Sequence, residues 1–317
     1  MNSAVTPQAL AASARARAQQ LTVTLDSTLT SYWYYPARNS KSLGSIVFIH
    51  GYRGNHHGLE AIAGAISNFD VYIPDLPGFG ASEPFSQKHT IDRYARWVRD
   101  FLESLKLNAK PHLLGHSFGS IVVSAYASQY QGISSLILEN PVAAPALTGP
   151  KAATTKLAKA FFWLAGALPD ALGTGLLKSW PMVRGMSIIM TKTRQRDLRS
   201  WVHQQHDENF NDFANRRVAL EAYQASISNC VCDFAAKFTA PTLMMIGELD
   251  DITTVAHGEL DDITTVAQQQ VLFENLPVKQ KRLKQHGAVG HLTHYEVPAA
   301  IANDIEQWAS EVGESRK

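Results

Sequence analysis

Short apolar runs alternate with amphipathic segments along most of this chain, and this alternation constrains the fold more than any other feature. The runs are mainly apolar on both faces, as strands are when helices cover both sides of a parallel sheet. They occupy residues 45–50, 71–75, 112–115, 135–138 and 242–246. Between them, the periodicity predicts helices, most clearly over residues 91–107 and 121–130. Strands that alternate with helices predict an α/β fold with a mostly parallel central sheet flanked by helices.

Two segments depart from this alternation. Residues 21–25 and 29–35 alternate with period two, which predicts a hairpin that turns at Asp26 and Ser27. From about residue 143 to residue 232 the pattern is helical and rich in Trp and Phe, which predicts an inserted helical cap over a binding site. The expected division of the chain is an N-terminal extension over residues 1–19, one large core over residues 20–142 and 233–317, and a cap over residues 143–232.

Composition and charge exclude several classes of function. The hydrophobic share of 45% and the charged share of 18% are those of an ordinary globular protein. A net charge of +1 gives no indication of binding to nucleic acid or to an anionic membrane. The chain has no run of about 18 apolar residues, so we expect no transmembrane segment.

The N-terminus and the cysteines bear on the cellular compartment. Residues 1–20 lack the apolar stretch of a signal peptide, and their Ala, Arg and Gln predict a short exposed helix. Cys230 and Cys232 are only two positions apart, and we expect two free thiols. Together these features predict a cytoplasmic protein.

A tandem duplication interrupts the C-terminal part of the chain. The ten residues from Gly247 to Ala256 recur letter for letter from Gly258 to Ala267, with His257 between the copies. Solenoid repeats need at least three units of 20 or more residues, so two short identical copies indicate a recent duplication of eleven residues.

The pentapeptide Gly115-His-Ser-Phe-Gly119 is the motif that carries chemistry. An apolar strand leads into it and a helix leaves it, as in the tight turn that exposes a nucleophilic serine above the edge of a sheet. Such a turn needs small residues two positions before and two positions after the serine, here Gly115 and Gly119, and the following helix begins with a field that favours negative charge. We therefore predict that Ser117 is a nucleophile. The alternative is a buried serine that caps the helix.

The order of motifs resembles the α/β-hydrolase superfamily from about residue 20 to residue 313, and most closely its capped serine esterases and carbon–carbon bond hydrolases. The motifs are, in chain order, His50-Gly51, Asp75-Leu-Pro-Gly-Phe-Gly-Ala81, Gly115-His-Ser-Phe-Gly119, the helical insert, Gly247-Glu-Leu-Asp250 and Gly290-His291. The resemblance implies that the backbone N–H groups of Tyr52 and Phe118 form an oxyanion hole. It implies no metal and no organic cofactor.

The resemblance also implies a base and an acid that follow the serine in the order acid, then histidine. His291 matches the base, and His294 is its nearest rival. His50 and His116 belong to the motifs as structural or lining residues. For His56 and His57 we expect a solvated helix start, with a substrate-lining role as the alternative.

Asp250 matches the acid, and the duplication supplies Asp261 as an alternative in an identical turn. Asp250 is favoured because the first copy keeps the apolar strand before it. Asp251, Asp262, Glu139 and Asn140 are weaker candidates.

The resemblance implies a Ser-His-Asp hydrolase that cleaves a carboxylic ester of a small or medium-sized substrate through an acyl-enzyme on Ser117. The first alternative is a carbon–carbon bond hydrolase of aromatic meta-cleavage products, for which Arg53, Arg184, Arg194 or Arg196 would have to face the pocket. Thioesterase, amidase, lactonase and perhydrolase chemistry remain open. A non-catalytic ligand receptor of the same fold is the alternative from a different class.

Overall fold

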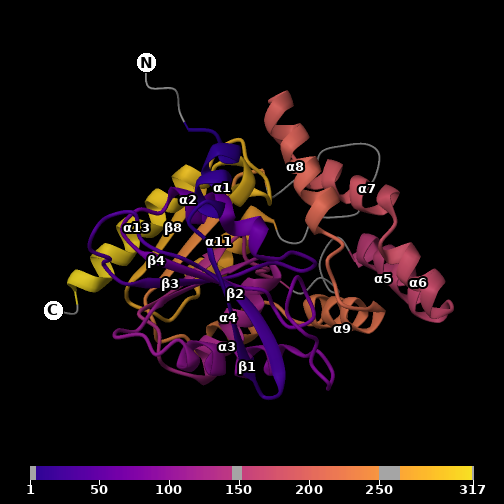
Figure 1. Ribbon diagram of the computed structural model, residues 1–317, viewed down its shortest axis with the longest axis horizontal. Helices are drawn as coiled ribbons and strands as arrows, with labels where there is room; N and C mark the ends of the chain where they lie inside the picture. The colour runs from indigo at the N-terminus through magenta and orange to yellow at the C-terminus, as the bar shows by residue number, and fades with distance from the viewer. Residues whose placement is uncertain (1–4, 145–151, 250–264, 316–317) are drawn as a thin grey trace.

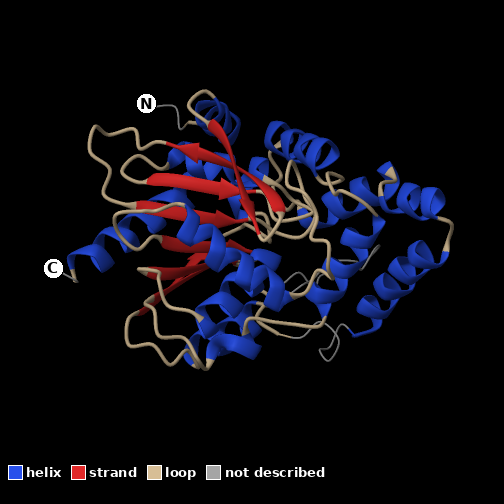
Figure 2. Ribbon diagram, turned by 60° about the horizontal axis from the view of Figure 1, so that its bottom comes forward, coloured by secondary structure: helices blue, strands red, loops and turns tan. Residues whose placement is uncertain are grey.

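A computed structural model of the chain describes residues 5–144, 152–249 and 265–315. Within these residues eight strands form one sheet, in the order β1-β2-β4-β3-β5-β6-β7-β8 (Figure 2). The strands are β1 (Gln19–Leu25), β2 (Thr28–Tyr35), β3 (Ser45–Ile49), β4 (Asp70–Pro74), β5 (His112–His116), β6 (Ser135–Glu139), β7 (Thr242–Gly247) and β8 (Lys281–His286). All neighbouring strands from β4 to β8 are parallel, which confirms the mostly parallel sheet.

The predicted hairpin is the antiparallel pair β1 and β2. Asp26 and Ser27 both have positive φ, 45° and 61°, which is the backbone of a two-residue hairpin turn. β2 then pairs antiparallel with β4, so the hairpin extends the parallel sheet at one edge.

Helices cover both faces of the sheet (Figure 1). On one face, α2 (Glu60–Ala65) and α13 (Pro298–Glu314) bury Ile62, Ile301, Ile305 and Trp308 against β3, β4 and β7. On the other face, α3 (Ile91–Ser104), α4 (Phe118–Gln129) and α11 (Val266–Glu274) pack into a second cluster of buried residues. The short elements η1 (His56–Leu59) and α12 (Thr293–Glu296) lie at the ends of strands.

The segment between β6 and β7 consists, in its described residues, of helices and the loops that connect them. Its helices are α5 (Ala152–Ala167), α6 (Asp170–Leu177), α7 (Trp180–Met190), α8 (Arg196–Asn209), α9 (Arg216–Ile227) and the single turn α10 (Cys232–Ala235). Only an isolated bridge between Phe79 and Phe213 joins it to a loop of the core by strand-like pairing within the described ranges. Figure 1 shows α5 to α8 on the opposite side of the molecule from the C-terminus. None of the described helices is both long and apolar enough to cross a membrane.

The N-terminal helix is less exposed than its composition predicts. Helix α1 (Pro7–Arg15) begins at Thr6, whose side chain caps the helix by accepting from the N–H of Ala9. Leu10, Ala11 and Ala14 are buried against α2. The expectation of an exposed helix was wrong because Gly64 of α2 lets the backbone of Leu10 approach so closely that any side chain would collide with it.

The cysteines are also paired rather than free. Cys230 and Cys232 form a disulfide bond. Val231 between them has helical φ and ψ, which holds the two Cα atoms 5.2 Å apart and within the range that a disulfide spans. Close spacing in the sequence therefore did not prevent pairing.

Candidate active site

Ser117 lies in the sharp turn between β5 and α4 that the pentapeptide predicts. Its φ of 51° and ψ of −117° are rarely adopted by a residue with a side chain. The backbone is held there because the Ser117 N–H donates to the carbonyl of Glu139, at 3.1 Å. Phe118 begins α4, so its N–H is one of the donors that a helix leaves without an intrahelical partner.

The glycines of the turn are required by close backbone contacts. A methyl group on Gly115 would lie 2.4 Å from the carbonyl oxygen of Gly119, and one on Gly119 would lie 2.2 Å from that of Ile49. We predict that Gly119→Ala lowers the free energy of unfolding by about 3 kcal/mol, because backbone atoms cannot move aside cheaply. Urea unfolding measures the change. The matched control is Gly175→Ala in α6, where an added methyl group would meet no atom within 4 Å beyond the backbone of its own helix. A gain of about 0.5 kcal/mol in the free energy of unfolding is expected there. Equal effects of the two changes would contradict the prediction.

His291 reaches Ser117 from the other end of the chain. Its Nε2 lies 2.9 Å from Ser117 Oγ, and both residues are buried. The loop that carries His291 follows β8. It is fixed by Asn140, whose side-chain amide donates to the carbonyl of Gly290 at 3.1 Å. The structure therefore brings together the predicted nucleophile and the predicted base.

The predicted acids lie outside the described residues, both Asp250 and the alternative Asp261, as do Asp251 and Asp262. The chain on either side is described. After β7, the N–H of Leu249 donates to the carbonyl of Val289 at 2.8 Å, two residues before His291. The chain is described again from Thr265, which caps α11.

The predicted oxyanion turn follows β3. His50 is buried and links this turn to the loop after β4. Its Nδ1 lies 2.8 Å from the carbonyl oxygen of Gly51, and its Nε2 accepts from the N–H of Leu76 at 2.9 Å. Burial lowers the pKa of His50, so the imidazole is neutral and able to accept. The Tyr52 hydroxyl donates to the carbonyl of Ala219 at 2.8 Å, which joins this turn to α9.

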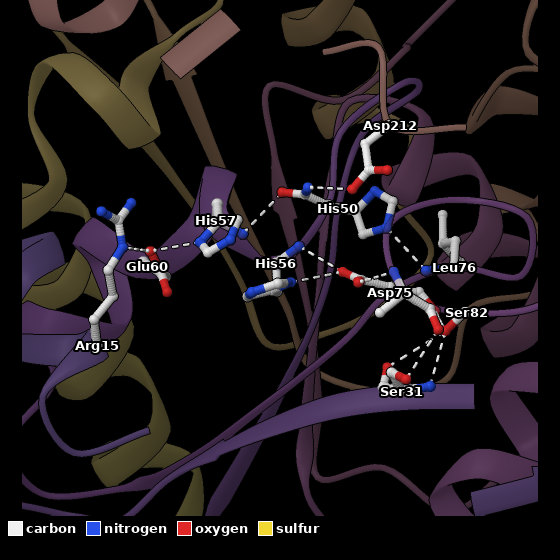
Figure 3. A network of polar contacts seen from close by, with 12 residues as sticks. Arg15, Ser31, His50, His56, His57, Glu60, Asp75, Leu76, Ser82 and Asp212 are labelled. Carbon is white, nitrogen blue, oxygen red and sulfur yellow. Dashed lines mark hydrogen bonds and ion pairs between the residues drawn. The ribbon is translucent and has the colours of Figure 1, made fainter. Parts of the chain in front are cut away.

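A buried polar network lies next to this turn (Figure 3). The Asp75 carboxylate accepts from the backbone N–H of His56 at 2.7 Å and from that of Ala81 at 2.9 Å, and it lies 2.9 Å from His56 Nδ1. Burial raises the pKa of Asp75, but the hydrogen bond and charge of His56 outweigh it, so the net shift is downward. The carboxylate of the Asp75 motif thus ties the loop after β4 to the helix start after β3.

The expectation that His56 lies at a solvated helix start is wrong. His56 is buried rather than solvated, and its ring stacks on Trp33 with ring centroids 3.3 Å apart. His57 is partly exposed, with Nδ1 3.1 Å from a carboxylate oxygen of Glu60 that also accepts from Arg15 of α1 (Figure 3). A helix start reads the same in sequence whether an aromatic side chain from a distant strand covers it or not.

A second buried cluster lies behind Ser117. The Glu139 carboxylate accepts from the Thr293 hydroxyl at 2.5 Å and lies 3.4 Å from His116 Nδ1 and 3.7 Å from His294 Nδ1. Burial, followed by the nearby His116 and His291, holds the pKa of His294 well below its usual value, so His294 is neutral. His294 therefore belongs to this cluster, whereas His291 contacts Ser117. Sequence reasoning did not identify Thr293, whose only signal is its position two residues after His291.

Three groups within the described ranges have ligand atoms close enough to share a metal ion. They are His56, His57 and Glu60; His116, Glu139 and His294; and Cys230, Cys232 and Asp233. The cysteines of the third group are bonded to each other, which removes their thiolates as ligands.

A dienoate substrate would need an arginine in the pocket, and two of the four candidate arginines already bind other groups of the protein. Arg53 is fully buried and donates to the carbonyls of Phe210 at 3.0 Å and Leu177 at 2.8 Å in the helical insert. Arg184 pairs with Asp207. Arg194 and Arg196 are exposed.

Buried neutral histidines predict acid sensitivity. Burial lowers the pKa of His206 to about 3 and that of His89 to about 4. The unfolded chain binds these protons near pH 6.5 and the folded chain does not, so stability falls as the pH drops below about 6.5. We predict a slope of about 1.4 kcal/mol per pH unit for each histidine down to its folded pKa. Urea unfolding at a series of pH values measures it. A His206→Gln variant with an unchanged slope would refute the assignment.

The comparisons with known proteins agree with this architecture. Residues 44–298 match the family described as the alpha/beta hydrolase fold. The chain therefore belongs to the α/β-hydrolase fold family, as the order of motifs predicts.

Individual relatives are more distant. The chain is 25% identical to Lipase 3 of Moraxella sp. (strain TA144) over 283 residues, which cover 85% of this chain and 79% of that protein. Among solved structures, an esterase from Exiguobacterium antarcticum superposes with a TM-score of 0.70 at 18% identity over 92% of this chain and 100% of that chain. A thermophilic esterase from Thermogutta terrifontis gives 0.67 at 20% identity over 93% and 99%.

Proposed function

We propose that the chain is a serine hydrolase that cleaves carboxylic esters of small or medium-sized substrates through an acyl-enzyme on Ser117. The observation that carries the proposal is the 2.9 Å contact between His291 Nε2 and Ser117 Oγ in a strained turn above the sheet edge. A neutral serine hydroxyl is a poor nucleophile, and an imidazole at hydrogen-bond distance can take its proton. The relatives named as a lipase and as esterases favour an ester over a carbon–carbon bond. The engagement of Arg53 and Arg184 leaves fewer cations for a dienoate.

In the proposed mechanism, His291 takes the Ser117 proton as Oγ attacks the ester carbonyl. The oxyanion of the tetrahedral intermediate accepts from the N–H groups of Tyr52 and Phe118. His291 then gives its proton to the leaving alcohol, which leaves the acyl group on Ser117. Water attacks this acyl-enzyme with His291 again as base, and the acid product departs. Asp250 is assigned the role of orienting His291, with Asp261 as the alternative.

The helical insert, residues 143–232, is assigned the role of a cap over this site. Its support is a set of contacts between the insert and both halves of the predicted machinery. Phe162 of α5 packs against Tyr52, with ring centroids 6.4 Å apart, and Arg53 donates to the last turn of α6. On the other side, a methyl group on Gly290 would lie 2.5 Å from the side chain of Lys192. The space between these helices and the turn that carries Ser117 would then determine which substrates fit.

Hydrolysis of a ladder of p-nitrophenyl esters, from acetate to long acyl chains, tests the proposal together with covalent labelling by a fluorophosphonate. We expect turnover with a preferred chain length, and a phosphonyl adduct on the peptide that contains Ser117. Absence of both turnover and labelling would overturn the proposal. Turnover with the adduct on a different serine would overturn the assignment of Ser117.

A further inference from the structure

Helices α5, α6 and α7 expose large apolar side chains on the outside of the insert. We call Trp163, Leu164, Leu172, Trp180 and Ile188 the outer apolar face. The exposed fraction is 72% for Trp163, 62% for Leu172 and 61% for Trp180. Of the eleven exposed large hydrophobic residues in the described ranges, five lie within these 26 positions. Scattered single residues are the ordinary case, so five exposed large side chains on three consecutive helices are the feature that needs explaining.

This exposure is not an unfilled core, because the same helices bury their opposite sides. In α5, Ala165 is fully buried and Phe162 stacks on Tyr223 with centroids 3.6 Å apart, whereas Trp163 points outward. In α7, Val183 and Ser187 are buried, while Trp180 and Ile188 lie eight residues apart on one side of the helix. Arg184 lies between them and covers the Trp180 ring at 5.5 Å. These helices also form the edge of the molecule farthest from the C-terminus (Figure 1).

The charge of the same part of the chain is strongly positive. Residues 152–199 contain eight Lys and Arg and only two Asp, a net charge of +6. The remaining residues contain 21 basic and 26 acidic side chains, a net charge of −5. The overall charge of +1, which gives no indication of membrane binding, therefore conceals two parts of opposite sign. Lys159 is exposed in α5, one helical turn before Trp163. Lys178 follows α6 two residues before Trp180 and is also exposed, with its ammonium 4.7 Å from the centroid of the Phe213 ring.

We propose that the outer apolar face docks on the anionic surface of a phospholipid bilayer. Tryptophan favours the boundary between headgroups and acyl chains, because its ring is apolar and its N–H is polar. Basic side chains near the surface add attraction to anionic lipids, each worth about a fivefold gain in affinity at low salt. A second copy of this chain fits less well, because two such faces would bring like charges together. If the proposed function holds, the site beneath the cap would take its ester from the bilayer.

Sedimentation with sucrose-loaded vesicles tests this docking, using phosphatidylcholine alone and phosphatidylcholine mixed with phosphatidylglycerol. We expect the full chain to bind the mixed vesicles, and salt to weaken the binding. We expect the double variant Trp163→Ser, Trp180→Ser to bind at least about tenfold more weakly. The double variant Lys159→Glu, Lys178→Glu is expected to bind the mixed vesicles about 25-fold more weakly, or weaker still. The matched controls are Leu43→Ser with Val271→Ser, which are 59% and 58% exposed outside the insert, and Lys110→Glu with Lys279→Glu.

Three outcomes would overturn the proposal. They are no binding to the mixed vesicles, equal loss in the matched controls, or a dimer in analytical ultracentrifugation that the tryptophan variant abolishes without any vesicle binding. The test is separable from the proposed function, because Ser117→Ala is expected to bind vesicles like the unaltered chain. Conversely, the tryptophan variant is expected to hydrolyse a soluble ester at the unaltered rate.

Discussion

Ser117→Ala and His291→Ala are each expected to lower kcat for a p-nitrophenyl ester by about ten-thousand- to million-fold. The double variant is expected to be no slower than either single one. Once the base is absent, the serine oxygen has no acceptor for its proton, and once the serine is absent the base has no proton to take. The effects of two groups that act as a unit are therefore not additive. Steady-state kinetics on the three variants measures this, with circular dichroism to show that each is folded.

The controls for this experiment are a second serine of α4 and the rival histidine. Ser128→Ala changes a serine of the same helix α4, whose hydroxyl only donates to the carbonyl of Ala125. His294→Gln changes the rival histidine, which faces Glu139. We expect less than about a tenfold loss of kcat in either. If His294→Gln were inactive and His291→Ala active, the base would have to be reassigned. Additive losses in the double variant would contradict the coupled mechanism.

The sheet could be predicted because its strands carry their environment in their own residues. A strand covered on both faces must be apolar on both faces, so β3, β5, β6 and β7 stand out as short apolar runs. The last strand, β8, does not stand out in this way, because its residues are Lys-Arg-Leu-Lys-Gln-His and it is only half-buried. The antiparallel hairpin carries a period of two and a turn, which are equally local signals.

The features that were missed depend on partners far along the chain. The alanine-rich α1 has the same composition whether or not Gly64 offers it a close approach. His56 is buried because Trp33 stacks on it from β2, and no local pattern reveals that partner. The disulfide is the exception, because it is local: the helical φ and ψ of Val231 set the separation of the two Cα atoms.

The candidate site divides along the same line. Ser117 was found because the strand, the two glycines and the helix are contiguous, and each is required by contacts within a few residues or with the neighbouring strand. His291 was found through the order of motifs, and the structure places it 2.9 Å from Ser117 Oγ. The contacts of Thr293 with Glu139 and of Asn140 with Gly290 join residues about 150 positions apart. A sequence pattern read locally cannot pair such residues.

Asp250→Asn is expected to lower kcat by about ten-thousand-fold, whereas Asp261→Asn is expected to lower it by less than about tenfold. Asparagine keeps the shape of the acid but favours the wrong imidazole tautomer, so the loss reports the residue that orients His291. Asp250 is favoured because it directly follows Leu249, which is hydrogen-bonded to Val289 in the loop that carries His291. The reverse pattern of losses would assign the acid to the second copy. Equal, small losses would show that neither aspartate is required alone.

Deleting residues 248–258 distinguishes the role of the acid from the effect of the eleven added residues, because one copy of the repeated segment then remains, joined to β7. Asp261 would then follow the strand at the position that Asp250 has now, and the separation between acid and base would fall by eleven residues. We expect this variant to keep kcat within about tenfold of the full chain. In the shortened chain, Asp261→Asn is then expected to lower kcat by about ten-thousand-fold, although the same change lowers it by less than about tenfold in the full chain. This reversal would show that position after β7, rather than either copy's own sequence, makes the acid. If deletion alone abolished turnover, the added residues would have to be part of the site.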